Sequence, residues 1–147
     1  MVLKIDIKLP KDRAKTGLLF CDDLRMQCYG KSDNETAAKN DNPRRNPLFP
    51  WGDIPSGQYG KTNLVWLSTK TPVGEAWIPI EGIGGDALTA KQNGRHGLGI
   101  HAGRGSGRLI PTYGCLRLKA KDFYTLALHI RDEDVEIEIT EGDVTWA

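Results

Sequence analysis

The chain has 147 residues, of which 39% are hydrophobic, and its 20 basic and 19 acidic side chains nearly cancel. This length fits a single domain over residues 1–147 with a sizeable buried core. No basic stripe is present to attract nucleic acid, and no apolar run approaches the roughly 18 residues of a membrane-spanning helix. We therefore expect neither nucleic acid nor a membrane as a partner.

The N-terminal segment alternates apolar and polar residues. Its apolar members are Leu3, Ile5, Ile7 and Leu9. This period of two predicts a half-buried strand. The charged residues between them interrupt the apolar run that a secretory signal peptide requires, so we expect none at this end.

A hairpin is predicted next, with strands over residues 17–20 and 26–29 around Asp22 and Asp23. Three cysteines are an odd number, so at least one thiol is free. Cys21 and Cys28 would face each other only if the turn were centred on residues 24–25, whereas two aspartates form the better turn. This favours two unpaired strand cysteines, with a disulfide between them as the alternative.

The segment from Lys31 to Gly52 is rich in Asn, Asp and Pro and shows no periodicity. A stretch of this length without regular structure is either a solvated surface loop or a functional loop. In the second reading it is a lid over a peptide cleft, with Arg44 and Arg45 contacting substrate carboxylates.

Further strands are predicted over residues 64–67, 76–80 and 135–139. Four apolar residues spaced as one helical stripe predict a packed helix near residues 121–130: Phe123, Leu126, Ala127 and Ile130. A second, short helix is compatible with residues 86–92. Many short strands and one good helix predict a mainly β fold, specifically a β sandwich with a packed α-helix.

The chemistry of the chain centres on His101 and Cys115. His101 lies on a glycine-flanked turn, and Cys115 stands between Gly114 and the strand-like residues 116–118. A connecting loop would let neighbouring strands bring the two side chains together. Because a free thiol is mostly protonated at neutral pH, an imidazole must take or hold its proton, and the pair predicts a depressed Cys115 pKa. The alternatives are a small buried cysteine and a structural histidine.

These residues carry a resemblance to a known family. His101 followed by Tyr113-Gly114-Cys115-Leu116-Arg117 resembles the catalytic block of L,D-transpeptidases of the YkuD type, a histidine-glycine turn followed by Ser-His-Gly-Cys-x-Arg. Upstream, residues 54–59 (Ile-Pro-Ser-Gly-Gln-Tyr) look like the family's Thr-Pro-x-Gly-x-Tyr/Phe segment. The resemblance covers roughly residues 17–140.

The resemblance implies roles for individual residues. Cys115 would be the nucleophile and His101 its proton partner, with the backbone N–H groups of Gly114 and Cys115 as oxyanion donors. Four residues would lie near substrate: Arg117, Tyr113, Thr112 and His96. For Arg117 the alternative is structural support, and for His96 it is an ordinary loop position. No cofactor is implied, and His96, His101 and Cys115 lack the ligand spacing of a zinc site, so no metal is expected there.

Thr112 and Tyr113 stand where the family has serine and histidine, so the second imidazole of the family block is absent. Variants without it look similar to antibacterial effectors that are delivered into a competitor's periplasm. For such a protein a specialised secretion route would replace a signal peptide, and an immunity or delivery protein would be a partner. This inference is fold-level analogy.

The function that the resemblance implies is cysteine-dependent acyl transfer on peptidoglycan stem peptides in the periplasm or cell wall. The reaction would be that of an L,D-transpeptidase, an L,D-carboxypeptidase or a D-amino-acid exchanger. The alternative is a non-catalytic module on the same scaffold that binds peptidoglycan or a protein.

Overall fold

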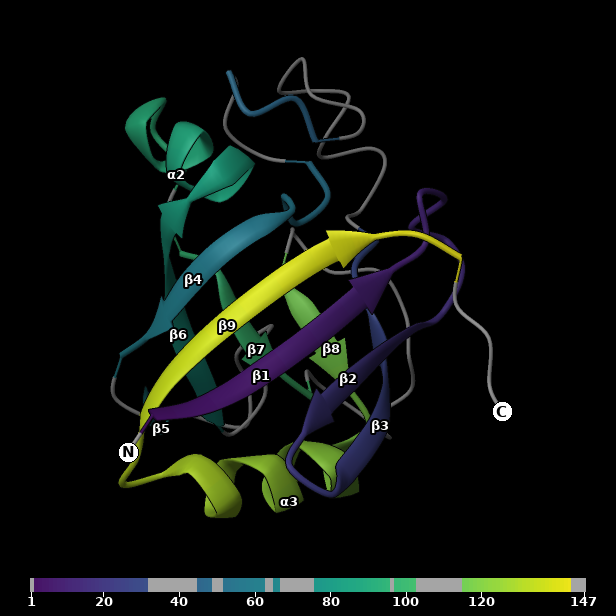
Figure 1. Cartoon of the computed structure of the whole chain (residues 1–147), viewed down its shortest axis with the longest axis vertical. Helices are drawn as coiled ribbons and strands as arrows, with labels where there is room; N and C mark the ends of the chain where they lie inside the picture. Colours follow the sequence, from purple (N-terminus) through teal and green to yellow (C-terminus); the bar gives the residue numbers. More distant parts are fainter. Residues whose placement is uncertain are drawn as a thin grey trace.

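The computed structural model describes residues 2–31, 45–48, 52–62, 65–66, 76–95, 97–102 and 115–143. Within these residues the chain forms strands and two helices in mixed order (Figure 1). The elements are β1 (Val2–Leu9), β2 (Gly17–Cys21), β3 (Leu24–Tyr29), β4 (Gly57–Lys61), β5 (Val65–Trp66), β6 (Ala76–Gly84), α2 (Gly85–Gln92), β7 (Gly99–His101), β8 (Leu116–Leu118), α3 (Ala120–Ile130) and β9 (Asp134–Glu141). The fold is mainly β, as the sequence predicts.

The strands form one sheet in the order β4-β9-β1-β2-β3-β8-β7-β6-β5, and a further pairing of β4 with β6 closes it. The result is a closed, barrel-like sheet with β5 attached to the free part of β6, and not the predicted sandwich of two sheets. Alternating hydrophobicity shows that one face of a strand is buried, but it does not show which distant strand completes the sheet.

The predicted N-terminal strand is confirmed as β1, which runs antiparallel to β2 and parallel to β9. The parallel register places Ile5 beside Ile137 and Ile7 beside Ile139. All four side chains are buried. Their apolar faces therefore line the interior of the barrel, while the polar residues between them face outward.

The β2–β3 hairpin turns at Asp22 and Asp23, as predicted, because Cys21 pairs with Leu24 across the turn. Asp22 adopts a positive φ of 52°, a conformation that aspartate tolerates better than most residues. Cys28 pairs with Gly17 at the other end of the hairpin, so the two cysteines are far apart in register. Both are free and buried, which confirms the reading of two unpaired strand cysteines.

The two helices cover different parts of the sheet. The predicted apolar stripe of α3 is buried in the core, and the helix lies across the lower end of the barrel in Figure 1. The short helix α2 is also present and packs against β6 and β4. A side chain at Gly82 would approach the backbone oxygen of Ala87 to 2.3 Å, so glycine at this position permits the close contact between β6 and α2.

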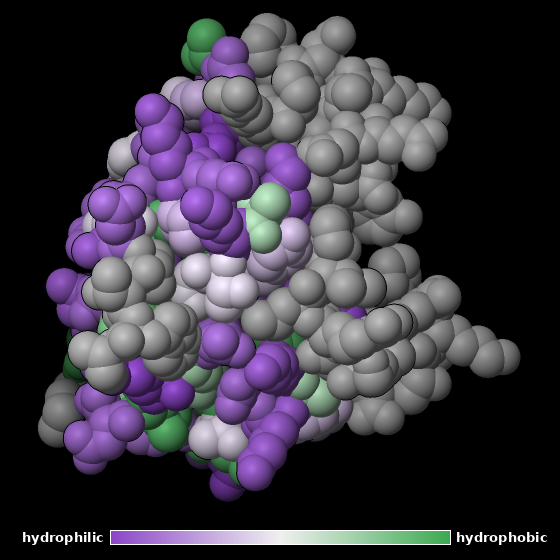
Figure 2. Space-filling model, turned by 90° about the vertical axis from the view of Figure 1, so that its right-hand side faces the viewer, coloured by the Kyte–Doolittle hydropathy of each residue, from purple (hydrophilic) through white to green (hydrophobic). Residues whose placement is uncertain are grey.

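Hydrophilic side chains predominate on the described part of the face drawn in Figure 2, which lies to the right in Figure 1. Neither helix in the described part of the chain is long and apolar enough to cross a membrane.

Candidate functional site

The site is built on β7 and β8, two short strands that run parallel and lie side by side in the barrel. Their register pairs His101 with Arg117, and the neighbouring strands add Trp77 on β6 and Tyr29 on β3 to the same row. Register partners on adjacent strands point to the same side of a sheet. The intervening residues Ile100 and Leu116 belong to the core, so His101 and Arg117 project from the opposite, outer face.

Cys115 immediately precedes β8, two residues before Arg117. Strand alternation therefore places Cys115 on the same outer face as Arg117 and His101. Its thiol donates a hydrogen bond to the carbonyl of Gly97 at 3.5 Å, and the backbone of Gly99 forms a hydrogen bond to the sulfur. The register thus places Cys115 and His101 as diagonal neighbours, one beside β8 and one on the adjacent strand β7. Their catalytic roles stay predictions.

Gly99 occupies the position beside Cys115. A side chain there would lie 2.1 Å from a ring carbon of Trp77, so the indole covers the backbone of this residue. An added methyl group has no room without displacing Trp77. Glycine at position 99 therefore allows the Trp77 ring to lie against the backbone of β7, beside the position of Cys115.

All three side chains are buried, with exposed fractions of 7% for Cys115, 2% for His101 and 4% for Arg117. Nδ1 of His101 is buried and has no hydrogen-bond partner within the described part of the chain, whereas Arg117 interacts with other groups. A buried polar atom without a partner is costly and uncommon in folded proteins. Nδ1 is therefore the atom of the imidazole that is available to a proton donor on this face.

The pKa values of Cys115 and His101 do not favour the thiolate that the sequence predicts. Burial raises the pKa of the Cys115 thiol to about 11, against the opposing effects of the Gly99 backbone and the Arg95 charge. Burial, followed by the neighbouring Arg117 cation, lowers the pKa of His101 to about 4. At neutral pH the site therefore holds a neutral thiol and a neutral imidazole. The predicted depressed Cys115 pKa is wrong for this resting arrangement, because desolvation disfavours both charged forms.

This arrangement predicts the pH dependence of alkylation. Only the thiolate reacts with iodoacetamide, so the alkylation rate of Cys115 should rise about tenfold per pH unit between about pH 6 and pH 9. Changing His101 to alanine should leave this slope intact. The measurement is peptide mass spectrometry of timed samples, which separates Cys115 from Cys21 and Cys28. A rate that is flat over this range, and that falls in the His101→Ala variant, would instead indicate a preformed thiolate–imidazolium pair.

Arg95 is a site residue that the sequence reasoning did not identify. Its side chain is 7% exposed, and Nη2 donates to the carbonyl of Gly52 at 2.7 Å. Its positive charge lowers the pKa of the Cys115 thiol, although burial outweighs this effect. A cation beside a nucleophilic sulfur stabilises the thiolate when it forms. The only signal in the sequence is an arginine between glycines a few residues before His101, which has no fixed spacing to recognise.

A cavity of about 510 Å³ lies between α2, β6 and the chain leading into β7. Its described lining residues include Arg95 and Gly97, which also contact or influence Cys115. Cys115, His101 and Arg117 are not among the described lining residues. The cavity therefore adjoins the site through the chain at Gly97 without containing its reactive groups.

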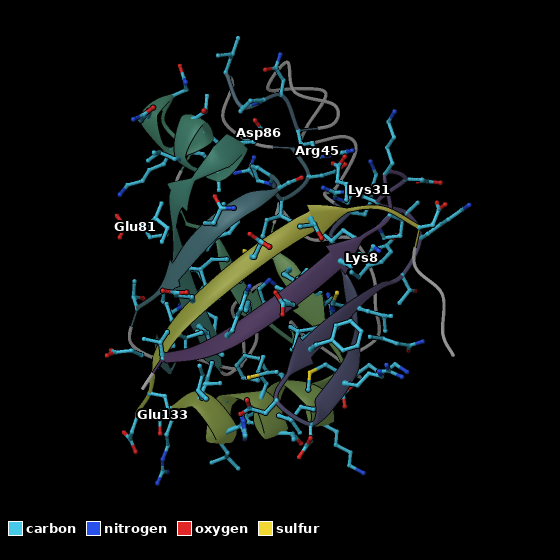
Figure 3. All side chains as sticks on the ribbon, in the orientation of Figure 1. Lys8, Lys31, Arg45, Glu81, Asp86 and Glu133 are labelled. Atoms are coloured by element: carbon cyan, nitrogen blue, oxygen red, sulfur yellow. The ribbon has the colours of Figure 1, made fainter. Side chains whose placement is uncertain are left out.

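Arg45, predicted as a contact to substrate carboxylates, binds carboxylates of its own chain. Its guanidinium contacts Glu141 at 2.6 Å and Asp53 at 3.4 Å. Lys31 also contacts Asp53, and Figure 3 shows Lys31 and Arg45 at the same end of the barrel, where β9 ends. Arg13 adds a second, buried contact to Glu141 at 2.9 Å. These ion pairs tie segments at that end of the barrel together, so the described contacts of Arg45 are structural.

The remaining predicted site residues, His96, Thr112, Tyr113 and Gly114, lie outside the described residues, as do residues 32–44 with Arg44. Their roles stay predictions.

Comparison with known proteins gives a likeness in structure and none in sequence. No protein-family model and no curated protein matches the sequence. The structure is similar to that of an L,D-transpeptidase from Mycobacterium smegmatis, with 12% sequence identity and a TM-score of 0.46. The match covers 94% of this chain, and the chain spans 59% of the length of that protein.

Proposed function

We propose that this protein is a cysteine acyltransferase that acts on peptidoglycan stem peptides ending in D-alanine. The observation that carries the proposal is the placement of Cys115, His101 and Arg117 on one face of two adjacent parallel strands. A thiol, an imidazole and a guanidinium in this arrangement supply a nucleophile, a proton acceptor and a cation. The resemblance of the Cys115 block to L,D-transpeptidases supplies the substrate class.

In the proposed reaction the sulfur of Cys115 attacks the carbonyl carbon of the L-centre that precedes the terminal D-alanine. The thiol proton passes to Nδ1 of His101 and then to the departing amine of D-alanine. The thioester that remains is attacked by an amine, giving a cross-link or an exchanged D-amino acid, or by water, giving L,D-carboxypeptidase activity. His101 takes the proton of the attacking amine or water and returns it to the sulfur.

The resting protonation states bear on the order of these events. Because the thiol and the imidazole are both neutral, the proton leaves sulfur as the carbon–sulfur bond forms and not before substrate arrives. Arg95 stabilises the developing thiolate through its charge. Backbone N–H groups at Gly114 and Cys115 then hold the negative charge that develops on the carbonyl oxygen.

The proposal is tested by incubating purified protein with stem peptides that end in D-alanine and analysing the products by mass spectrometry. We expect release of free D-alanine together with a shortened, cross-linked or exchanged peptide. The Cys115→Ala variant should give none of these products while keeping its circular dichroism spectrum. Product formation that survives in this variant would contradict the assignment of Cys115.

A second function, a non-catalytic module that binds cell-wall peptide or a protein, is favoured by one observation. Cys115 is buried and its raised pKa leaves little thiolate at neutral pH. For a binder, the wild-type protein and the Cys115→Ala variant should bind purified peptidoglycan equally in a sedimentation assay, and neither should release D-alanine.

A further inference from the structure

A cluster of three potential metal ligands lies at the turn of the β2–β3 hairpin, on elements separate from Cys115. Cys21 ends β2, Asp22 begins the turn, and His129 comes from the last turn of α3. One ligand atom from each residue, a sulfur, a carboxylate oxygen and a ring nitrogen, lies within 4.8 Å of the other two. The proposed acyl transfer uses none of these residues.

The three potential ligands come from two separate elements, the β2–β3 hairpin and helix α3. Cys21 and Asp22 are consecutive residues where β2 enters the hairpin turn, and α3 lies against this end of the hairpin in Figure 1. His129 Nε2 and Asp22 Oδ2 are 2.8 Å apart, so the helix and the turn are already in contact through these side chains. Residues more than a hundred positions apart in sequence therefore converge at one point.

The exposure of the three residues suits an ion that enters from solvent. Cys21 is buried, whereas the side chains of His129 and Asp22 are 35% and 52% exposed. Tetrahedral zinc, with ligand bonds of about 2.0–2.3 Å, places neighbouring ligand atoms roughly 3–4 Å apart. The two exposed side chains need only small rotations to reach that spacing, and the fixed sulfur provides the buried end of the site.

The charges around the sulfur also favour a cation. The carboxylates of Asp22 and Asp6 lie near enough to the Cys21 sulfur to act on it electrostatically. The same carboxylates that disfavour a bare thiolate attract a divalent ion, which would replace the proton on sulfur. The cluster therefore combines a soft sulfur ligand, a borderline nitrogen ligand and a hard oxygen ligand beside negatively charged carboxylates.

We propose that Cys21, Asp22 and His129 bind a zinc-like divalent cation that clamps helix α3 to the β2–β3 hairpin. Mixed sulfur, nitrogen and oxygen ligation is typical of zinc, and three protein ligands leave a fourth position for water. On binding, the sulfur–hydrogen bond of Cys21 is replaced by a sulfur–metal bond and the proton passes to buffer; no electron is transferred. The bound ion would join helix α3 to the turn of the β2–β3 hairpin in the sheet.

The test uses the full-length protein, reduced and freed of metal, titrated with Zn²⁺ by calorimetry and with Co²⁺ by absorption spectroscopy. We expect a single high-affinity equivalent of Zn²⁺, a rise in melting temperature on binding and a thiolate-to-cobalt charge-transfer band. His129→Ala should weaken Zn²⁺ binding by about tenfold or more, as loss of a supporting or direct ligand does. Cys21→Ser should remove the charge-transfer band.

Two matched variants keep the test decisive. Cys28→Ser removes the other hairpin cysteine and should retain the cobalt band, and Cys115→Ala excludes the thiol of the candidate active site. Because His129 is partly exposed on α3, its alanine variant is expected to fold even if Cys21→Ser does not. The proposal is overturned if no stoichiometric Zn²⁺ binds, if His129→Ala binds as tightly as wild type, or if the cobalt band depends on Cys115 or Cys28.

Discussion

Replacing His101 with glutamine is expected to slow release of D-alanine from stem peptides by about 10²–10⁴-fold, the usual contribution of a positioned general base. Glutamine is polar and similar in size, but it cannot accept the thiol proton. Within the described residues Nδ1 of His101 is buried and has no hydrogen-bond partner, so this ring nitrogen is the proposed proton acceptor. The measurement is the initial rate of D-alanine release at neutral pH, with substrate held well above KM.

A structural role for His101 would give a different pattern. If the imidazole only supports packing, glutamine should restore most of the activity lost in His101→Ala, and the rate should show no pH dependence attributable to the histidine. For a proton acceptor, both variants should be similarly slow, and wild-type activity should fall as pH drops toward the lowered His101 pKa of about 4. Protonation removes the acceptor, so activity is lost on the acid side.

The largest effect on stability is expected for Phe123→Ala. The ring of Phe123 is 1% exposed in the core beneath the barrel, and truncation of a buried phenylalanine costs about 3–5 kcal/mol of unfolding free energy. A domain of this kind has about 5–15 kcal/mol in total, so the variant should be close to unfolding at elevated temperature. Urea unfolding followed by circular dichroism measures the difference.

Leu128→Ala is the matched control on the same helix. Its side chain is 68% exposed on the face of α3 that points away from the core, so the change should stay within about 0.5 kcal/mol. Comparable losses in both variants would mean that the apolar stripe of α3 does not anchor the helix to the barrel.

The local elements of this fold could be predicted because their patterns are complete within a few residues. The alternation of Val135, Ile137 and Ile139 predicted β9, the stripe around Phe123 predicted α3, and two aspartates predicted the hairpin turn. Closure of the sheet could not be predicted in this way. It depends on pairing of β4 with β6 and of β1 with β9, contacts between distant segments that leave no periodic trace in either strand.

For the candidate site, the sequence located Cys115 and His101 through the spacing of a glycine-rich block, and the parallel β7–β8 pair brings them to one face. The protonation states could not be predicted, because the Cys115 and His101 pKa values depend on burial and on Arg95 and Arg117 nearby. The contact between His129 and Asp22 was missed for a related reason. His129 is exposed beside the apolar stripe of α3, and its contact to Asp22 depends on where the distant β2–β3 hairpin lies.

The most direct test of the acyl-transfer account is to trap the thioester. Wild-type protein is mixed with a stem peptide ending in D-alanine, quenched in acid at short times and analysed by intact-mass and peptide mass spectrometry. The account predicts an adduct of the peptide minus D-alanine on Cys115, absent in Cys115→Ala and accumulating in wild type before product. Release of D-alanine by the Cys115→Ala variant, or an adduct confined to Cys21 or Cys28, would contradict it.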